Sequence, residues 1–121
     1  MGNLSEEAKR LIGENKPALV ATASKDGKPN VSPKGSFHVL DDEHVAFANI
    51  ASPRTIANLR ENPQLSAIVF DPATRKGCRI WGKAEILDSG EKFNAISAEY
   101  AARKMAVKHI VIITVEDVVI F

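Results

Sequence analysis

The spacing of apolar residues changes several times along the chain, and each change predicts a different element. Near the N-terminus the apolar positions recur with helical periodicity and predict a short surface helix. Ser5 or Asn3 can cap this helix, which should end near Gly13. Its apolar face consists of Leu4, Ala8, Leu11 and Ile12.

Alternating apolar and polar residues after this helix predict two hairpins. The first hairpin turns at an Asp-Gly pair, which is the strongest short signal for a tight turn between strands. The second turns at three consecutive acidic residues. The predicted strands and turns are 19–24 and 28–32 around Asp26-Gly27, and 37–40 and 45–48 around residues 41–43.

A second helix is predicted where Ser52 stands as N-cap and Pro53 occupies the first helical position. The helix should stop at Asn62-Pro63. Strands are expected at 65–70 and 78–87, because both stretches are rich in β-formers and are separated by the turn at Asp71-Pro72.

A third helix is expected after Ser89, which we predict as its cap. Four residues should share one face of this helix: Phe93, Ile96, Tyr100 and Lys104. The final strand, 109–121, is apolar on both of its faces. A second copy of the chain or the third helix must cover the second face, and the pattern favours a homodimer.

These elements predict a mainly β protein, a small antiparallel barrel or sandwich with about six strands and short helices, in one domain over residues 1–121. The chain has 121 residues, of which 45% are hydrophobic and 26% charged, as in ordinary globular proteins. A net charge of +1 argues against nucleic-acid binding. The apolar runs are too short for a membrane-spanning helix. With a single cysteine, Cys78, the expected location is the cytoplasm.

The sequence contains no phosphate-binding P-loop, no dinucleotide-binding glycine motif and no serine-nucleophile motif. The three histidines, at 38, 44 and 109, lack metal-ligand spacing, so no metal site is expected. A nucleophilic role for Cys78 is disfavoured, because thiols buried in strands are usually inert. No catalytic side chain is identified.

Two features point to ligand chemistry. Arg54 and Thr55 lie in the first turn of the second helix, where a cation opposes the helix dipole unless an anion binds there. A solvated arginine explains the same residue equally well. The segment Ser32–Ser36 places a proline and Lys34 at a strand end, which is either an open ligand edge or a plain exit into a loop.

Three segments together resemble the pyridoxamine 5′-phosphate oxidase-like split-barrel flavoproteins: NVSPKGSF at 30–37, FANIASPRTIANLRENP at 47–63 and GKAEIL at 82–87. The chain is also similar to the small bacterial FMN-binding proteins of that superfamily. The resemblance extends from Leu4 to Phe121. Its most specific part is the arrangement Ser52-x-Arg54-Thr55, helix, Asn62-Pro63.

The resemblance implies a six-stranded antiparallel split β-barrel and a homodimer with FMN at the subunit interface. It places Lys34, Arg54 and Thr55 on the FMN phosphate, with Ser52 beginning the phosphate-binding helix. The backbone facing the flavin ring would come from Ser32, Pro33, Ala48 and Asn49. Trp81 and Phe121 would reach the ring of the other subunit.

The expected function is that of an FMN-dependent oxidoreductase or small electron carrier. A deazaflavin (F420)-dependent reductase and a non-catalytic flavin-storage or flavin-sensing module are the alternatives. Vitamin B6 oxidation is not expected, because the terminal strand lacks the substrate-binding Arg and Trp of those oxidases. Thr55 stands where a second basic residue often binds the phosphate, which implies moderate FMN affinity.

Overall fold

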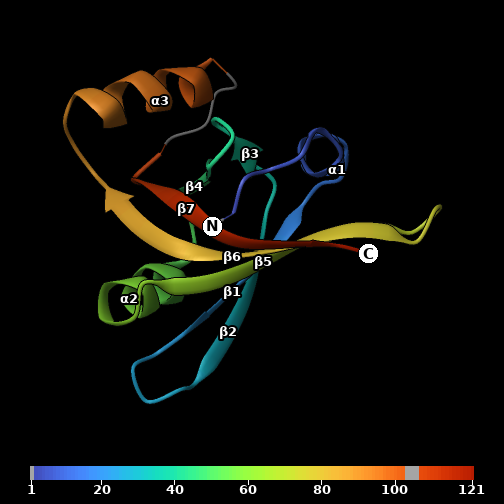
Figure 1. Cartoon of the computed structure of the whole chain (residues 1–121). Coiled ribbons are helices and arrows are strands. Elements are labelled where there is room, and N and C mark those ends of the chain that lie inside the picture. The colour runs from blue at the N-terminus through green and yellow to red at the C-terminus, as the bar shows by residue number, and fades with distance from the viewer. Residues whose placement is uncertain (1, 103–106) are drawn as a thin grey trace.

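A computed structural model describes residues 2–102 and 107–121. Within these ranges one antiparallel sheet curls into a half-barrel, and three short helices lie against it (Figure 1). The helices are α1 Glu6–Glu14, α2 Pro53–Glu61 and α3 Glu91–Ala101. The strands are β1 Ala18–Ala23, β2 Pro29–Lys34, β3 His38–Val39, β4 His44–Asn49, β5 Gln64–Asp71, β6 Lys76–Leu87 and β7 His109–Ile120.

The predicted mainly β split-barrel class is confirmed. The described residues form seven strands in the order β2-β1-β5-β6-β7-β4-β3. Each of them overlaps one of the strand segments predicted from the sequence, whereas the family resemblance implied six. The strand β3 has two residues, within the predicted 37–40, and pairs only with β4 at the sheet edge.

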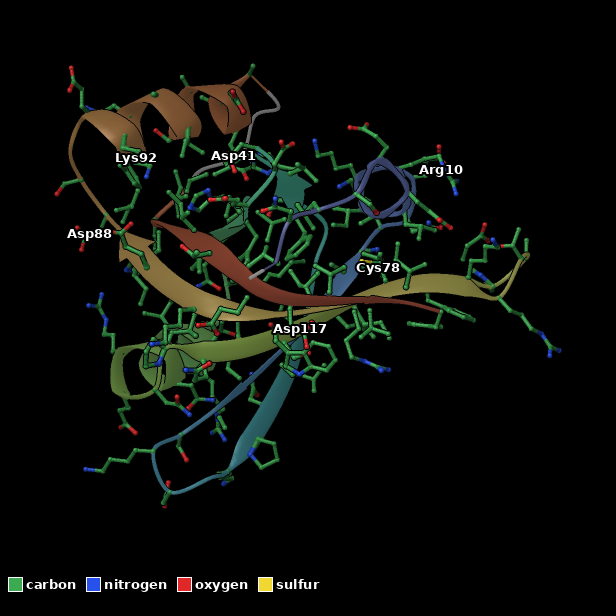
Figure 2. All side chains as sticks on the ribbon, in the orientation of Figure 1. Arg10, Asp41, Cys78, Asp88, Lys92 and Asp117 are labelled. Atoms are coloured by element: carbon green, nitrogen blue, oxygen red, sulfur yellow. The ribbon has the colours of Figure 1, made fainter. Side chains whose placement is uncertain are left out.

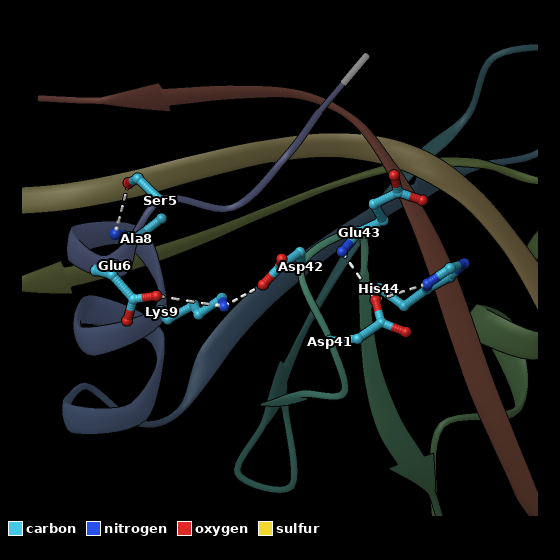
Figure 3. A network of polar contacts seen from close by, with 8 residues as sticks. All are labelled: Ser5, Glu6, Ala8, Lys9, Asp41, Asp42, Glu43 and His44. Carbon is cyan, nitrogen blue, oxygen red and sulfur yellow. Dashed lines mark hydrogen bonds and ion pairs between the residues drawn. The ribbon is translucent and has the colours of Figure 1, made fainter.

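The first helix begins as predicted, since the hydroxyl of Ser5 accepts a hydrogen bond from the backbone N–H of Ala8 at 3.1 Å. Lys9 of this helix pairs with Asp42 in the turn between β3 and β4 (Figure 3). In the same turn Asp41 accepts hydrogen bonds from the backbone N–H of Glu43 and from the ring of His44, both at 2.8 Å. The acidic turn is therefore ordered by side-chain acceptors and fixed to α1.

Ser89 does not cap the third helix, so that prediction is wrong. The N-cap of α3 is Gly90, at a positive φ of 99°, and the Ser89 hydroxyl donates to Asp88 instead. Glycine adopts this backbone conformation without steric cost, whereas serine does not. Lys104, predicted on the same face as Tyr100, lies outside the described residues.

The helix α3 covers one face of the first half of β7. Ile110 and Ile112 pack with Tyr100 in a cluster beneath α3, while Val111 and Ile113 point into the main core. In the first half of β7, the second apolar face is therefore covered by the third helix and not by a second copy of the chain. Beyond Val115 the strand is open, and the large side chains of Val119 and Phe121 are exposed.

Candidate functional site

The ends of β2 and β4 and the start of α2 meet around the side chain of Lys34. Its ammonium donates to Asn49 Oδ1 at 2.8 Å and to Ser52 Oγ at 2.7 Å. The residue is only 5% exposed. Asn49 in turn donates from Nδ2 to the carbonyl of Ser52 at 3.1 Å, which holds the loop between β4 and α2. The end of β2 and the loop between β4 and α2, which are distant in sequence, are thereby fixed around one cation.

Local sequence explains why Lys34 can stand at this place. β2 is an edge strand, paired on one side with β1, so Pro33 removes no interstrand hydrogen bond from the interior of the sheet. The alternation of β2 then turns Ser32 and Lys34 inward and leaves Pro33 exposed. The chain exits at Gly35, whose open surroundings allow the turn toward β3.

Lys34 is a buried cation that makes no ion pair within the described ranges 2–102 and 107–121. Both of its polar partners are neutral oxygens, and its ammonium lies 5.5 Å from the centre of the Phe47 ring. Burial lowers the pKa of Lys34 from its ordinary value, because removal of water disfavours the charged form. One N–H of the ammonium is left for a third acceptor. An anion would supply both the acceptor and the missing charge.

The first turn of α2 lies directly against this group. Thr55 is fully buried, and its hydroxyl is 3.1 Å from the hydroxyl of Ser32. Arg54 is exposed and forms no ion pair with any described residue, and the first turn carries no acidic side chain. The Ser52 hydroxyl, predicted as a helix cap, stands at the N-cap position but bonds Lys34 instead of a helix N–H. The N–H groups of this turn are therefore not capped by Ser52.

A cavity of about 270 Å³ opens beside Lys34. It is lined by Pro33, Lys34, Gly35, Ser36, Ala48, Ile50, Ala51 and Ser52. Of the predicted site residues, the structure thus brings together Ser32, Pro33, Lys34, Ala48, Asn49, Ser52 and Thr55, with Arg54 immediately beside them.

Trp81 and Phe121 are not part of this group within one chain. They lie on the face of the sheet turned away from the core, where they are 37% and 44% exposed. The Phe121 ring stacks on Phe70 with centroids 6.2 Å apart, and the Arg79 guanidinium lies 5.4 Å from the same ring.

The sequence analysis did not identify Ser36 as a site residue. Its hydroxyl accepts from the backbone N–H of Ala48 at 2.9 Å and donates to the carbonyl of Ala48 at 3.2 Å. The Tyr100 hydroxyl of α3 donates to the Ser36 carbonyl at 3.3 Å. Ser36 stands within the motif at 30–37, so its position was visible, but a contact with Ala48 depends on the fold. Ala48 therefore faces the cavity with its N–H already bonded.

The pyridoxamine 5′-phosphate oxidase family model matches residues 4–119, almost the whole chain. This chain belongs to that family. A stretch of 65 residues is 40% identical to the uncharacterized protein MJ0282 of Methanocaldococcus jannaschii, covering 52% of this chain and 43% of that protein. The chain therefore spans less than half the length of that relative.

Solved structures share the fold over nearly the full length. HupZ from Group A Streptococcus is 30% identical with a TM-score of 0.88, covering 97% of this chain and 93% of that one. An FMN-binding protein from Syntrophomonas wolfei is 19% identical with a TM-score of 0.83, covering 97% and 85%. An F420 reductase and HutZ, a heme storage protein of Vibrio cholerae, have TM-scores of 0.73 and 0.74 at 19% and 23% identity. The fold by itself therefore does not select the cofactor.

Proposed function

We propose that this protein binds FMN and acts as an oxidoreductase or small electron carrier. The observation that carries the proposal is the buried Lys34 ammonium, which has no acidic partner among the described residues and lies beside the start of α2. A phosphate dianion matches this arrangement, because it accepts several hydrogen bonds and neutralises the buried charge.

The residues around Lys34 divide into two groups according to what they would hold. Lys34, Arg54, Thr55 and the N–H groups of the first turn of α2 would bind the phosphate. The backbone of Ser32, Pro33, Ala48 and Asn49 would lie along the flavin ring. When bound, FMN supplies the hydride or electron transfer. Among the described residues, Lys34 is the one titratable side chain lining the 270 Å³ cavity, and in this proposal its role is to hold the phosphate.

A second copy of the chain completes the site in this proposal. The cavity beside Lys34 is smaller than the 300–1,000 Å³ typical of pockets for drug-sized ligands, so one chain encloses only part of FMN. The outer face of the sheet carries the apolar surface that such a partner would cover. Its exposed large side chains are Leu19, Val31, Phe70, Trp81, Val119 and Phe121. Covering that face would bring Trp81 and Phe121 of one subunit toward the flavin of the other.

A deazaflavin-dependent reductase and a flavin-storage module are the competing proposals. The first would use the same fold with a different chromophore, and the second is compatible with a cavity whose described lining has no acid–base side chain other than Lys34. The Lys34 site favours FMN, since a terminal phosphate monoester carries more charge than a diester. In the described residues no helix is long and apolar enough to cross a membrane.

An ultraviolet–visible spectrum of the purified protein, taken after addition of FMN and removal of unbound ligand by gel filtration, tests the proposal. Two flavin bands retained at about one FMN per chain are expected. A single deazaflavin-like band on the untreated protein would favour the reductase instead. Reduction of the bound flavin followed by reoxidation by an acceptor other than oxygen would exclude pure storage. Loss of all colour on the column would contradict the FMN proposal.

A further inference from the structure

A second, larger cavity lies on the other side of Arg54. It has a volume of about 700 Å³ and opens between the turn of the β1–β2 hairpin and the exposed flank of α2. In Figure 1 the β1–β2 hairpin extends past α2, and residues of both elements line the cavity. The charged side chains that line it are Lys25, Asp26, Lys28, Arg54 and Glu61.

Within the described residues, the three cations of this cavity have no ionic partners, although two carboxylates line the same space. No ion pair within 4.0 Å joins any of these five side chains in the described structure. Asp26 accepts a hydrogen bond from the Ser24 hydroxyl, and Glu61 accepts one from the backbone N–H of Lys25 at 3.3 Å. Asp26 thus stabilises the turn of the hairpin, and Glu61 links the hairpin to α2. The ammonium and guanidinium groups remain available to a ligand.

Residues that are consecutive in the chain line the large cavity and the Lys34 cavity. Ser52 lines the smaller one, Pro53 and Arg54 line the larger one, and all three precede or begin the same helix. A ligand phosphate at the start of α2 would therefore have immediately beyond it a cavity lined by three cations and two carboxylates. At about 700 Å³ this cavity lies within the usual range for ligand pockets.

We propose that this cavity binds a second phosphoryl group, so that the protein accepts a flavin dinucleotide such as FAD in addition to FMN. The inference rests on the proposed function, because it places the first phosphate at Lys34 and Arg54. The lining, as far as the structure describes it, contains no aromatic ring on which a base could stack. Recognition would therefore be of the phosphoryl charge by Lys25 and Lys28, and the adenosine part would add little.

Titrations of the full-length protein with FMN, FAD and riboflavin at one low salt concentration test this inference. Wild type should bind FAD at least as tightly as FMN. The double variant Lys25→Ala/Lys28→Ala should lose about tenfold in FAD affinity, the amount expected from losing exposed charge-assisted contacts, and less than twofold in FMN affinity. The matched control Lys83→Ala/Lys92→Ala removes two exposed lysines away from the cavity (Lys92 is labelled on α3 in Figure 2) and should change neither affinity.

Each other outcome counts against a specific statement. Tight FMN binding with much weaker FAD binding would overturn the second phosphoryl site and leave the proposed function intact. Equal losses of FMN and FAD affinity in the Lys25/Lys28 variant would show that these lysines act on the first phosphate, which also overturns it. If neither nucleotide bound more tightly than riboflavin, the phosphate site at Lys34 would fail, and this inference with it.

Discussion

Lys34 is held by two neutral oxygens in a position where an acidic side chain would ordinarily neutralise a buried cation. Keeping an ammonium charged after removal from water costs free energy, and hydrogen bonds to Asn49 and Ser52 offset only part of it. The lowered pKa of Lys34 expresses the same cost. At the scale of single residues, the site is thus prepared for a negative charge that no described residue supplies.

The pH dependence of FMN binding should report the titration of Lys34. Bound phosphate favours the protonated ammonium, so the pKa of Lys34 is higher in the complex than in the free protein, where burial lowers it below the ordinary 10.5. Affinity should therefore be constant below the pKa of the free protein and should fall as pH rises through it. Calorimetric titration from neutral to alkaline pH checks this. If the FMN affinity of Lys34→Met fell with pH in the same way, a group other than Lys34 would be responsible for the pH dependence.

Removal of the Arg54 guanidinium should weaken FMN binding by about 1.5–3 kcal/mol, the usual worth of a hydrogen bond to a charged group. Riboflavin, which lacks the phosphate, should bind Arg54→Ala as it binds wild type. Arg60, which is exposed at the other end of α2, provides the control Arg60→Ala. Unfolding of Arg54→Ala, or an unchanged FMN affinity, would show that Arg54 does not contact the phosphate.

At the scale of elements, the pairing of β6 with β7 depends on a glycine. Gly82 lies beside a β-bulge, where Trp81 pairs with Asp117 and Gly82 with Val115. A Cβ added at Gly82 would lie 2.3 Å from the carbonyl oxygen of Thr114, which is closer than a Cβ atom approaches a non-bonded atom in real proteins. Two backbones therefore come together here at a distance that only glycine permits.

The substitution Gly82→Ala should lower the free energy of unfolding by about 1–3 kcal/mol, since the strands must separate to admit the methyl group. The control Gly13→Ala has open space around its Cβ and stands in the helix α1. It should raise stability by about 0.5–1 kcal/mol through helix propensity. Urea denaturation of both variants measures the difference. Equal stability of Gly82→Ala and wild type would contradict the close approach at Thr114.

The elements were predictable where local chemistry decides them. Ser5 as cap, Pro53 at the start of α2 and the end of that helix before Asn62 all follow from backbone preferences of single residues. The cap of α3 was assigned to Ser89, one residue before the observed cap Gly90, because the positive φ of Gly90 is a property of the turn and not of a residue pattern. The role of the Ser52 hydroxyl was also missed, since its partner is Lys34, eighteen positions earlier in the sequence.

At the scale of the whole molecule, the outer face of the sheet exposes a group of large apolar side chains in the described part of the chain. Six large apolar side chains are exposed there, spread over β1, β2, β5, β6, β7 and Phe121 directly after β7. The sequence suggested a partner copy because the last strand is apolar on both faces. Helix α3 covers the second face of β7 at Ile110–Ile113, so that part of the strand needs no partner copy. The argument for a partner copy now rests on the exposed apolar side chains of the outer face. Which face of a strand a helix covers is set by tertiary packing, so periodicity alone could not decide it.

A homodimer built on the outer face should be broken by a charge introduced on that face. Leu19 is 44% exposed and pairs with Pro33 on one side and Ile68 on the other. Leu19→Asp should convert a dimer of 13.1 kDa chains into monomers without unfolding them. Analytical ultracentrifugation and circular dichroism check both parts. The control Ala95→Asp, on the exposed side of α3, should stay dimeric; a monomeric wild type would contradict the proposed interface.

The strand β4 is packed on both of its faces, since Val45 and Phe47 belong to the main core and Ala46 and Ala48 to the cluster under α3. Its amides should therefore be among the slowest in the protein to exchange hydrogen with solvent. The hairpin turn Ser24–Lys28 has no such cover among the described residues. Binding of FAD should therefore slow amide hydrogen exchange in the turn Ser24–Lys28 and change it little in β4. The part of the site that β4 forms is already rigid before the ligand binds.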